Sequence, residues 1–222
     1  MSGVVVVTGG ASGIGAAICS LLAARGHQVV VTDVDGAGAQ ALAATLAGGQ
    51  AMTLDVRDAN QSRHVADSVL ERHGRLDAWV SNAGVSRMAR FVDVDEAQYD
   101  FTLDVNLKGL FFAGQAAARA MQRQGRGGCI VNVASMAAKQ GRVPFLADYV
   151  ASKFGVVGLT QAMAFELAAD RIRVNAVCPG FVATPMQVRE LAWEAELRGS
   201  DADAVRRQWI TDTPMGRLQQ PE

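Results

Sequence analysis

Tyr149 and Lys153 stand four residues apart in the run Tyr-Val-Ala-Ser-Lys. On a helix these two positions lie on one face, close to each other. An ammonium about 4 Å from a phenol, at an effective dielectric of about 20, favours the phenolate by about 4 kcal/mol, which would lower the usual tyrosine pKa of about 10 by about three units. Such a tyrosine could serve as a general acid/base near neutral pH. A solvated lysine beside a half-buried tyrosine would show the same spacing.

A second pattern lies at the amino terminus. A β-branched run, residues 4–7, leads into Thr-Gly-Gly-Ala-Ser-Gly-Ile-Gly and then an apolar stretch with helical character. This order predicts a strand, a glycine turn and a helix. Such a turn approaches a pyrophosphate closely, and the phosphates bind to amide groups at the helix N-terminus. We therefore expect a dinucleotide rather than a turn without a ligand, held by Gly9, Ser12, Gly13, Ile14 and Gly15.

Asp33 follows the next predicted strand, residues 28–32, and indicates which dinucleotide is bound. An acidic side chain at this place can accept hydrogen bonds from the adenine ribose hydroxyls. A 2′-phosphate carries a charge of about −1.5 to −2 and would be repelled by several kcal/mol, on the order of a hundredfold in affinity. No Arg or Lys lies within residues 8–15 or next to Asp33 to compensate. The predicted cofactor is NAD rather than NADP.

Together these motifs resemble the short-chain dehydrogenase/reductase family, in the branch with a T-G-x-x-x-G-x-G turn. The resemblance runs from residue 4 to the last residue and implies hydride transfer between a nicotinamide cofactor and a secondary alcohol or ketone. It implies that Tyr149 is the general acid/base and that Lys153 lowers its pKa and binds the nicotinamide ribose. Ser135 would hydrogen-bond the substrate oxygen, and Asn106 would hold a water that links Lys153 to solvent.

The resemblance also implies a wider cofactor site. Asp55 and Val56 would flank the adenine, and Thr184 would help to hold the nicotinamide carboxamide. The crevice itself would be lined by Asn82, Ala83, Gly84, Pro179 and Gly180. Several of these side chains would also suit purely structural roles: Ser135 as a turn cap, Asn106 as a bend in a helix, Asp55 as a strand end and Thr184 as support for the turn before a proline.

Three features depart from the family pattern. Ser81 replaces an Asn that is common before Asn82. Ser135 and Tyr149 are one position further apart than is usual in the family, so we expect an extra residue in the loop around 142–144. The family's final helix and last strand are absent from the chain. We expect the natural chain to continue beyond Glu222, because the strand at 174–177 would otherwise be unpaired on one side.

Strands and helices are predicted to alternate along the whole chain. We expect strands at 4–8, 28–32, 50–54, 77–81, 128–133 and 172–177, and helices at 13–25, 36–47, 59–73, 96–123, 149–168 and around 187–209. This alternation predicts an α/β fold, a single Rossmann-type doubly wound parallel sheet with helices on both faces. Residues 1–222 would form one NAD(P)-binding domain, with 186–213 as a substrate lid.

Composition is consistent with one globular domain: 50% of the 222 residues are hydrophobic and 19% are charged. The net charge of −1 and the scattered basic residues give no footprint for nucleic acid or a membrane surface. Three cysteines without paired spacing indicate free thiols and a cytoplasmic location. The three histidines form no ligand-like pattern, so no metal site is expected.

Two further expectations concern partners and substrate. Residues 107–121 and 154–167 are apolar on more than one face, which indicates a homodimer or homotetramer, unless these helices are deeply buried in one monomer. The substrate is expected to be a small to medium secondary alcohol or ketone, including those with further hydroxyls. Candidate residues for the mouth, which would otherwise be ordinary core, are Met88, Met136, Gln140, Phe145 and Met186.

Two other functions remain open at this stage. One is an NADPH-dependent 3-oxoacyl-type reductase, which the acidic Asp33 disfavours. The other is a catalytically silent NAD(H)-binding interaction protein. The presence of Asn106, Ser135, Tyr149 and Lys153 together disfavours the silent protein, which would be free to lose them.

Overall fold

The computed structural model describes residues 2–222. Its centre is one parallel sheet with the strand order β3-β2-β1-β4-β5-β6. The strands are β1 (Val4–Thr8), β2 (Gln28–Asp33), β3 (Gln50–Thr53), β4 (Ala78–Ser81), β5 (Gly128–Val133) and β6 (Ile172–Val177). The strand order reverses between β1 and β4, and in open parallel sheets ligands bind at such a point, outside the carboxyl ends of the strands. The predicted fold class is confirmed.

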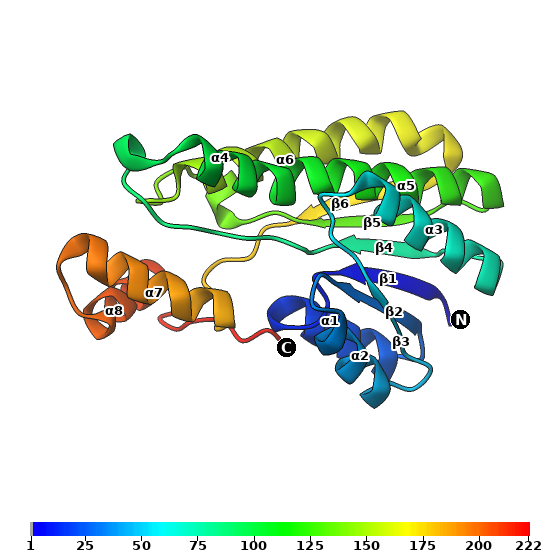
Figure 1. Ribbon diagram of the computed structural model, residues 1–222, viewed down its shortest axis with the longest axis horizontal. Coiled ribbons are helices and arrows are strands. Elements are labelled where there is room, and N and C mark those ends of the chain that lie inside the picture. Colours follow the sequence, from blue (N-terminus) through cyan, green and yellow to red (C-terminus); the bar gives the residue numbers. More distant parts are fainter. Residues whose placement is uncertain (1) are drawn as a thin grey trace.

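Helices cover both faces of the sheet (Figure 1). On one face lie α1 (Gly13–Ala24) and α2 (Gly36–Thr45). On the other lie α3 (Ala59–His73), α4 (Glu96–Leu103), α5 (Leu110–Gln124) and α6 (Ala147–Glu166). A separate pair, α7 (Pro185–Arg198) and α8 (Ala202–Asp212), lies beyond the carboxyl ends of the strands. Short 3₁₀ turns occupy Phe91–Asp93, Met136–Ala138 and Leu167–Asp170.

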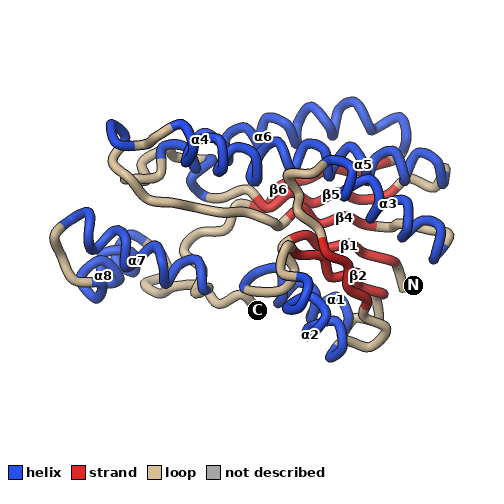
Figure 2. The backbone as a smooth tube through the Cα atoms, viewed as in Figure 1, coloured by secondary structure: helices blue, strands red, loops and turns tan. Residues whose placement is uncertain are grey.

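The sheet is buried as the sequence pattern predicts. All five residues of β1 are buried, because helices cover both of its faces. Trp79 of β4 is fully buried in the core between the sheet and α3 and α5. The strands run in the same direction, so their carboxyl ends lie at one edge of the sheet. The loops that follow the strands therefore gather at that edge (Figure 2).

The predicted helix over 96–123 is continuous but not uniform. Between α4 and α5 the chain forms a π-helical turn, Asp104–Gly109, which contains Asn106. Such turns are rare and frequently mark functional sites. The extra residue in the turn shifts the register of α5 relative to α4, so the bend expected at Asn106 has a structural basis.

The predicted single helix around 187–209 is wrong, because two helices occupy this region. Gly199 adopts a left-handed conformation (φ 62°) and ends α7. Asp201 then begins α8, and its side chain accepts a hydrogen bond of 2.7 Å from the amide of Ala204. A glycine C-cap followed by an acidic N-cap favours two helices over one.

Other local signals behave as expected. Asp58 caps α3 by accepting a hydrogen bond of 2.8 Å from the amide of Asn60.

At the end of the sheet, β6 pairs only with β5 within residues 2–222. Within the same residues, no helix is both long and apolar enough to cross a membrane.

Candidate functional site

A cavity of about 440 Å³ lies at the carboxyl ends of the strands. Its walls combine the glycine turn, the end of β2, the segments after β3, β4, β5 and β6, and the start of α7. The sequence-predicted site residues that line it are Gly9, Ser12, Gly13, Ile14, Asp33, Asp55, Val56, Asn82, Ala83, Gly84, Ser135, Tyr149, Lys153, Pro179, Gly180 and Thr184. Gly15 and Asn106 are not part of the lining; both are buried behind it.

Two glycines of the turn are required by close backbone approaches. Gly9 has φ +62°, and a Cβ atom there would lie 2.7 Å from Cα of Ala83. A Cβ atom on Gly15 would lie 2.0 Å from the carbonyl oxygen of Gly9. Ser12 is the N-cap residue of α1, and its side chain makes no capping hydrogen bond. The first amides of α1 therefore keep donors for an anion, which fits a dinucleotide pyrophosphate.

The loop after β4 is tied to this turn. The Asn82 side chain donates to the carbonyl oxygens of Thr8 (3.1 Å) and Gly9 (2.8 Å). The amides of Asn82 and Ala83 both donate to Thr8 Oγ1 at 3.1 Å. Thr8 was not among the predicted site residues, although it begins the glycine motif. These four bonds hold the two halves of the cavity wall together.

Asp33 occupies the end of β2, at the opposite end of the cavity from Tyr149. One carboxylate oxygen accepts from the amide of Ala11 and the other from the amide of Asp35, both at 3.0 Å. Each oxygen keeps a lone pair for a further donor. Asp33 therefore has two functions in the structure: it fixes the glycine turn and it presents a negative charge to the cavity.

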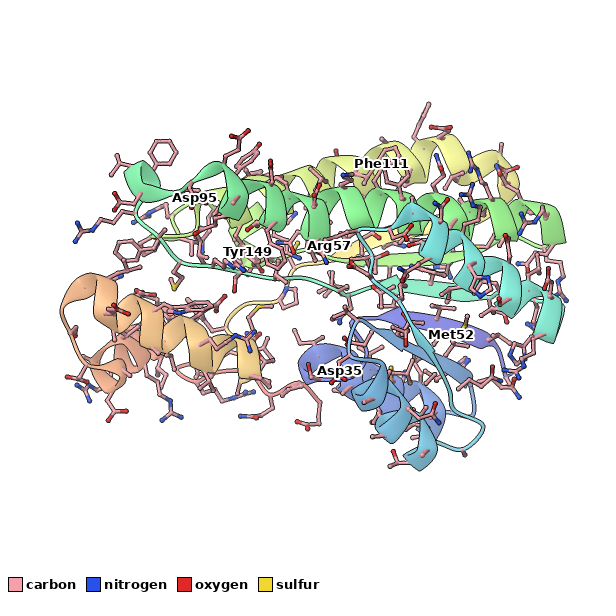
Figure 3. The ribbon with its side chains drawn as sticks, viewed as in Figure 1. Asp35, Met52, Arg57, Asp95, Phe111 and Tyr149 are labelled. Carbon is pink, nitrogen blue, oxygen red and sulfur yellow. The ribbon has the colours of Figure 1, made fainter. Side chains whose placement is uncertain are left out.

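Arg57, which sequence reasoning missed, also lines the cavity. Its guanidinium makes a bidentate ion pair with Asp55, with the shortest N–O distance at 2.6 Å. That pairing lowers the pKa of Asp55, chiefly through the hydrogen bond from Arg57. Figure 3 shows Arg57 on the side of the molecule that carries α4–α6. The charge of Arg57 is thus already balanced by Asp55.

Tyr149 lies in the first turn of α6, where Figure 3 shows it between the α4–α6 layer and α7. The preceding residue, Asp148, is buried and holds this turn against α4. Its carboxylate accepts from the amide of Tyr149 (2.9 Å), from Thr102 Oγ1 (2.8 Å) and from Gln98 Nε2 (3.3 Å). Asp148 was also missed, although its place directly before Tyr149 was a signal.

Lys153 is 4% exposed and follows Tyr149 by one helical turn. Its Nζ donates to the carbonyl oxygen of Val133 at 3.0 Å and lies 5.5 Å from the centre of the Tyr149 ring. Burial lowers the pKa of Lys153 to about 8. The helical spacing thus brings the two side chains together as predicted, but the ammonium is bonded to the end of β5.

The predicted lowering of the Tyr149 pKa is not found in the free protein. Burial raises the pKa of Tyr149 to about 12; a hydrogen bond with Ser135 opposes this rise, and the negative charge of Glu190 adds to it. Desolvation disfavours the phenolate. The ammonium charge by itself would favour the phenolate, but burial of the phenol has the larger effect.

Ser135 follows β5 and has the turn-capping role considered for it, while its bond to the substrate oxygen stays a prediction. Its hydroxyl oxygen accepts from the amide of Ala137 at 3.1 Å, which caps the turn 136–138. The same hydroxyl lies beside Tyr149 and acts to lower the pKa of its phenol. The amide of Met136 donates to the carbonyl oxygen of Pro179 at 2.8 Å, so this turn and the segment after β6 form one wall.

Asn106 is fully buried and bonded to protein on both ends of its amide. Its Oδ1 accepts from the amide of Val85 (2.8 Å), and its Nδ2 donates to the carbonyl of Val85 (2.9 Å) and to Ser152 Oγ (3.2 Å). A Cβ atom on Gly84 would lie 3.4 Å from Asn106 Oδ1 and 3.5 Å from Lys153 Nζ. Asn106 therefore positions the loop after β4 beside Lys153; its predicted water stays a prediction.

At the mouth the predicted residues divide. Met136, Gln140 and Met186 line the cavity, whereas Met88 and Phe145 do not. Phe145 has φ +62°, in the left-handed region that non-glycine residues seldom adopt. It lies in the loop where an extra residue was expected.

Thr184 caps α7 by accepting from the amide of Gln187 at 3.3 Å, and it also lines the cavity.

Comparison with known proteins identifies the family of this chain. The model for short chain dehydrogenases matches residues 3–195. D-threitol dehydrogenase of Mycolicibacterium smegmatis is 39% identical, over 99% of this chain and 81% of that protein. The 3-oxoacyl-[acyl-carrier-protein] reductase FabG of Thermotoga maritima is 37% identical, over 99% of this chain and 85% of that protein.

A solved structure agrees along nearly the whole chain. A variant of actinorhodin polyketide ketoreductase with NADPH superposes with a TM-score of 0.93 at 34% identity, covering 99% of this chain and 86% of that one. The family match in sequence and the likeness in fold thus agree. The chain belongs to the short chain dehydrogenase family and is an oxidoreductase of the type that uses a nicotinamide cofactor.

Proposed function

We propose that this protein is an NAD(H)-dependent dehydrogenase that interconverts a secondary alcohol and a ketone. The observation that carries the proposal is the convergence of Ser135, Tyr149 and Lys153 on one cavity whose far end presents Asp33. A hydroxyl, a phenol and an ammonium at one end of a dinucleotide-shaped site fit proton exchange with an alcohol oxygen.

Each residue has a defined task in this proposal. In oxidation Tyr149 accepts the proton of the substrate hydroxyl, and in reduction it donates a proton to the carbonyl oxygen. Ser135 hydrogen-bonds the same substrate oxygen and the phenol, and so keeps the two aligned. Lys153, held by the Val133 carbonyl, supplies positive charge beside the phenol. When bound, the nicotinamide supplies or accepts the hydride.

The raised pKa of Tyr149 decides which direction each pH favours. At neutral pH the phenol of the free protein is protonated, which is the form that reduction requires. Oxidation requires the phenolate, whose fraction increases as pH rises toward the pKa of about 12. We therefore expect the oxidation rate to rise with pH.

Asp33 supports NAD(H) as the cofactor. Its carboxylate faces the cavity and has no cationic partner in an ion pair within residues 2–222. A 2′-phosphate there would bring a second negative charge beside it. One observation favours the second candidate, an NADPH-dependent 3-oxoacyl-type reductase: Arg57 lines the same cavity and could turn toward a phosphate. The ion pair with Asp55 opposes that change.

We further propose a homo-oligomer formed through α5 and α6. Three phenylalanines on these helices are exposed: Phe111, Phe154 and Phe165, the last at 90%. Large exposed aromatic side chains on adjacent helices are typical of a protein–protein interface. The metal-free, cytoplasmic character expected from the sequence stays a prediction.

The test uses the two tyrosines of the chain as a matched pair. Tyr149→Phe removes the proposed acid/base, and Tyr99→Phe removes the hydroxyl of the exposed tyrosine on α4. We expect Tyr149→Phe to reduce NAD⁺-dependent oxidation of secondary alcohols by about 10²- to 10⁴-fold while NADH binding is retained. Tyr99→Phe should match the wild type. The quenching of tryptophan fluorescence measures NADH binding.

Two outcomes would reject the proposal. Full turnover by Tyr149→Phe would remove the role given to the phenol. A wild-type protein that binds NADH but neither oxidises secondary alcohols nor reduces ketones would favour the silent cofactor-binding protein.

A further inference from the structure

Helix α7 places an acidic side chain, Glu190, in the cavity wall at the end that contains Tyr149. Glu190 Oε1 accepts a hydrogen bond of 2.6 Å from Ser86 Oγ, and Ser86 is only 7% exposed. Ser86 belongs to the loop after β4, so the contact connects α7 to the wall opposite. Glu190 and Tyr149 line the same cavity, and the negative charge of Glu190 raises the pKa of Tyr149.

Apart from Ser86, Glu190 has no structural partner that would account for its position. Within residues 2–222 it makes no ion pair, and Ser86 is its only side-chain hydrogen-bond partner. Glu194, one turn further along α7, differs in this respect. It is ion-paired with Arg198 at 2.6 Å and accepts from Trp209 Nε1 at 3.1 Å, which fastens α7 to α8. Glu194 is thus explained by packing, and Glu190 is not.

The second carboxylate oxygen of Glu190 accepts no hydrogen bond from any described residue. A carboxylate oxygen that faces a cavity favours a hydrogen-bond donor and repels an anion. Desolvation raises the pKa of Glu190, which means that burying its charged form at this position is unfavourable. Such a cost is typical of a residue retained for a ligand.

We propose that Glu190, oriented by Ser86, binds a second hydroxyl of the substrate, so that the enzyme prefers polyols to simple secondary alcohols. The inference rests on the proposed alcohol–ketone function and narrows its substrate class. Tyr149 and Ser135 hold the reacting oxygen, and Glu190 accepts a hydrogen bond from a neighbouring hydroxyl. The same carboxylate disfavours hydroxy acids, whose own carboxylate would face it.

The experiment compares three four-carbon substrates that differ at one carbon: 2,3-butanediol, 2-butanol and protonated 3-amino-2-butanol. For wild type we expect kcat/KM for the diol to exceed that for 2-butanol by at least about tenfold. In Glu190→Ala this ratio should fall by at least about tenfold. Glu196→Ala, an exposed glutamate on the same helix, is the control and should keep the wild-type ratio.

Two further variants guard against loss of the fold. Glu190→Gln keeps the shape of the side chain and should lower the ratio less than Glu190→Ala does. Ser86→Ala leaves the carboxylate in place but removes its donor, and should also lower the ratio. An unchanged ratio in all three variants would overturn the proposal. A wild-type preference for the protonated amino alcohol would overturn it too, because Glu190 would then be a cation site.

A binding measurement separates this proposal from the function on which it rests. Calorimetry of the NADH-loaded protein should detect the diol, and Glu190→Ala should weaken that affinity at least about tenfold. Oxidation of 2-butanol and the diol at similar rates, with no effect of Glu190, rejects the polyol site while the dehydrogenase stands. Glu190-dependent diol binding without any turnover rejects the dehydrogenase while the binding site stands.

Discussion

Asp33→Asn is the perturbation that tests cofactor choice most directly. The carboxylate of Asp33 accepts two amides, from Ala11 and Asp35, each at 3.0 Å. Asparagine offers one acceptor oxygen and one donor nitrogen, so it can satisfy only one of the two amides. The substitution therefore removes the negative charge and also loosens the glycine turn.

The two effects have different magnitudes for the two cofactors. A lost hydrogen bond to a charged group is worth about 1.5–3 kcal/mol, so NADH should bind about 10- to 100-fold more weakly. NADPH suffers the same loosening of the turn but is relieved of a repulsion of several kcal/mol. The loosened turn weakens the binding of both cofactors equally, so this effect cancels in the ratio of their dissociation constants. We expect the preference for NADH over NADPH to fall by about 100-fold.

The assay titrates each variant with NADH and with NADPH, and tryptophan fluorescence reports the binding. Asp35→Asn is the control. The Asp35 carboxylate caps α2 by accepting from the amide of Gly38 at 2.9 Å and does not line the cavity. Asparagine is an equally good N-cap, so both dissociation constants should stay within about threefold of wild type. An unchanged preference in Asp33→Asn, or an equal change in Asp35→Asn, would refute the assignment of Asp33.

Three further expectations concern the proton of Tyr149, the buried carboxylate of Asp148 and the glycine turn at Gly15. Because the pKa of the Tyr149 phenol is about 12, kcat/KM for alcohol oxidation should increase by up to about tenfold per pH unit until the Lys153 ammonium, whose pKa is about 8, loses its proton; Glu190→Gln should move this rising limb to lower pH in a pH–rate profile. Asp148→Ala should lower the free energy of unfolding by about 2–4 kcal/mol in urea, since it leaves buried donors unpaired, whereas Asp148→Asn should recover part of the loss. Gly15→Ala should abolish NADH binding and lower the melting temperature by about 5–10 °C, because its Cβ would lie 2.0 Å from the Gly9 carbonyl oxygen; unaltered NADH binding would contradict the geometry of the turn.

The local elements could be predicted because their causes are local. The alternation of buried runs with helical stretches indicates a parallel sheet, and the bounds of most elements agree within a few residues. The region 187–209 was the exception, although the break is also local: Gly199 and Asp201 carry ordinary C-cap and N-cap chemistry. The single helix predicted around 187–209 runs across both of these caps.

The candidate site was predictable where chemistry follows from spacing. The glycine turn, Asp33 and the Tyr149–Lys153 pair each lie at the strand ends or the helix face that the sequence indicates. The sequence placed Glu190 only within the predicted lid and did not identify Arg57 or Asp148, because their importance follows from their places in the folded cavity wall. Glu190, for example, meets Ser86 across 104 positions of the chain.

The sequence by itself determined the strands and helices that build the sheet, the glycine turn and the pairing of Tyr149 with Lys153 on one helix face, because each depends on residues close together in the chain. Only the tertiary structure decided the electrostatics. Spacing alone predicted a lowered pKa for Tyr149, but the assembled fold buries the phenol and directs the Lys153 ammonium to the Val133 carbonyl. Desolvation depends on everything that packs around a group, and no local pattern contains that information.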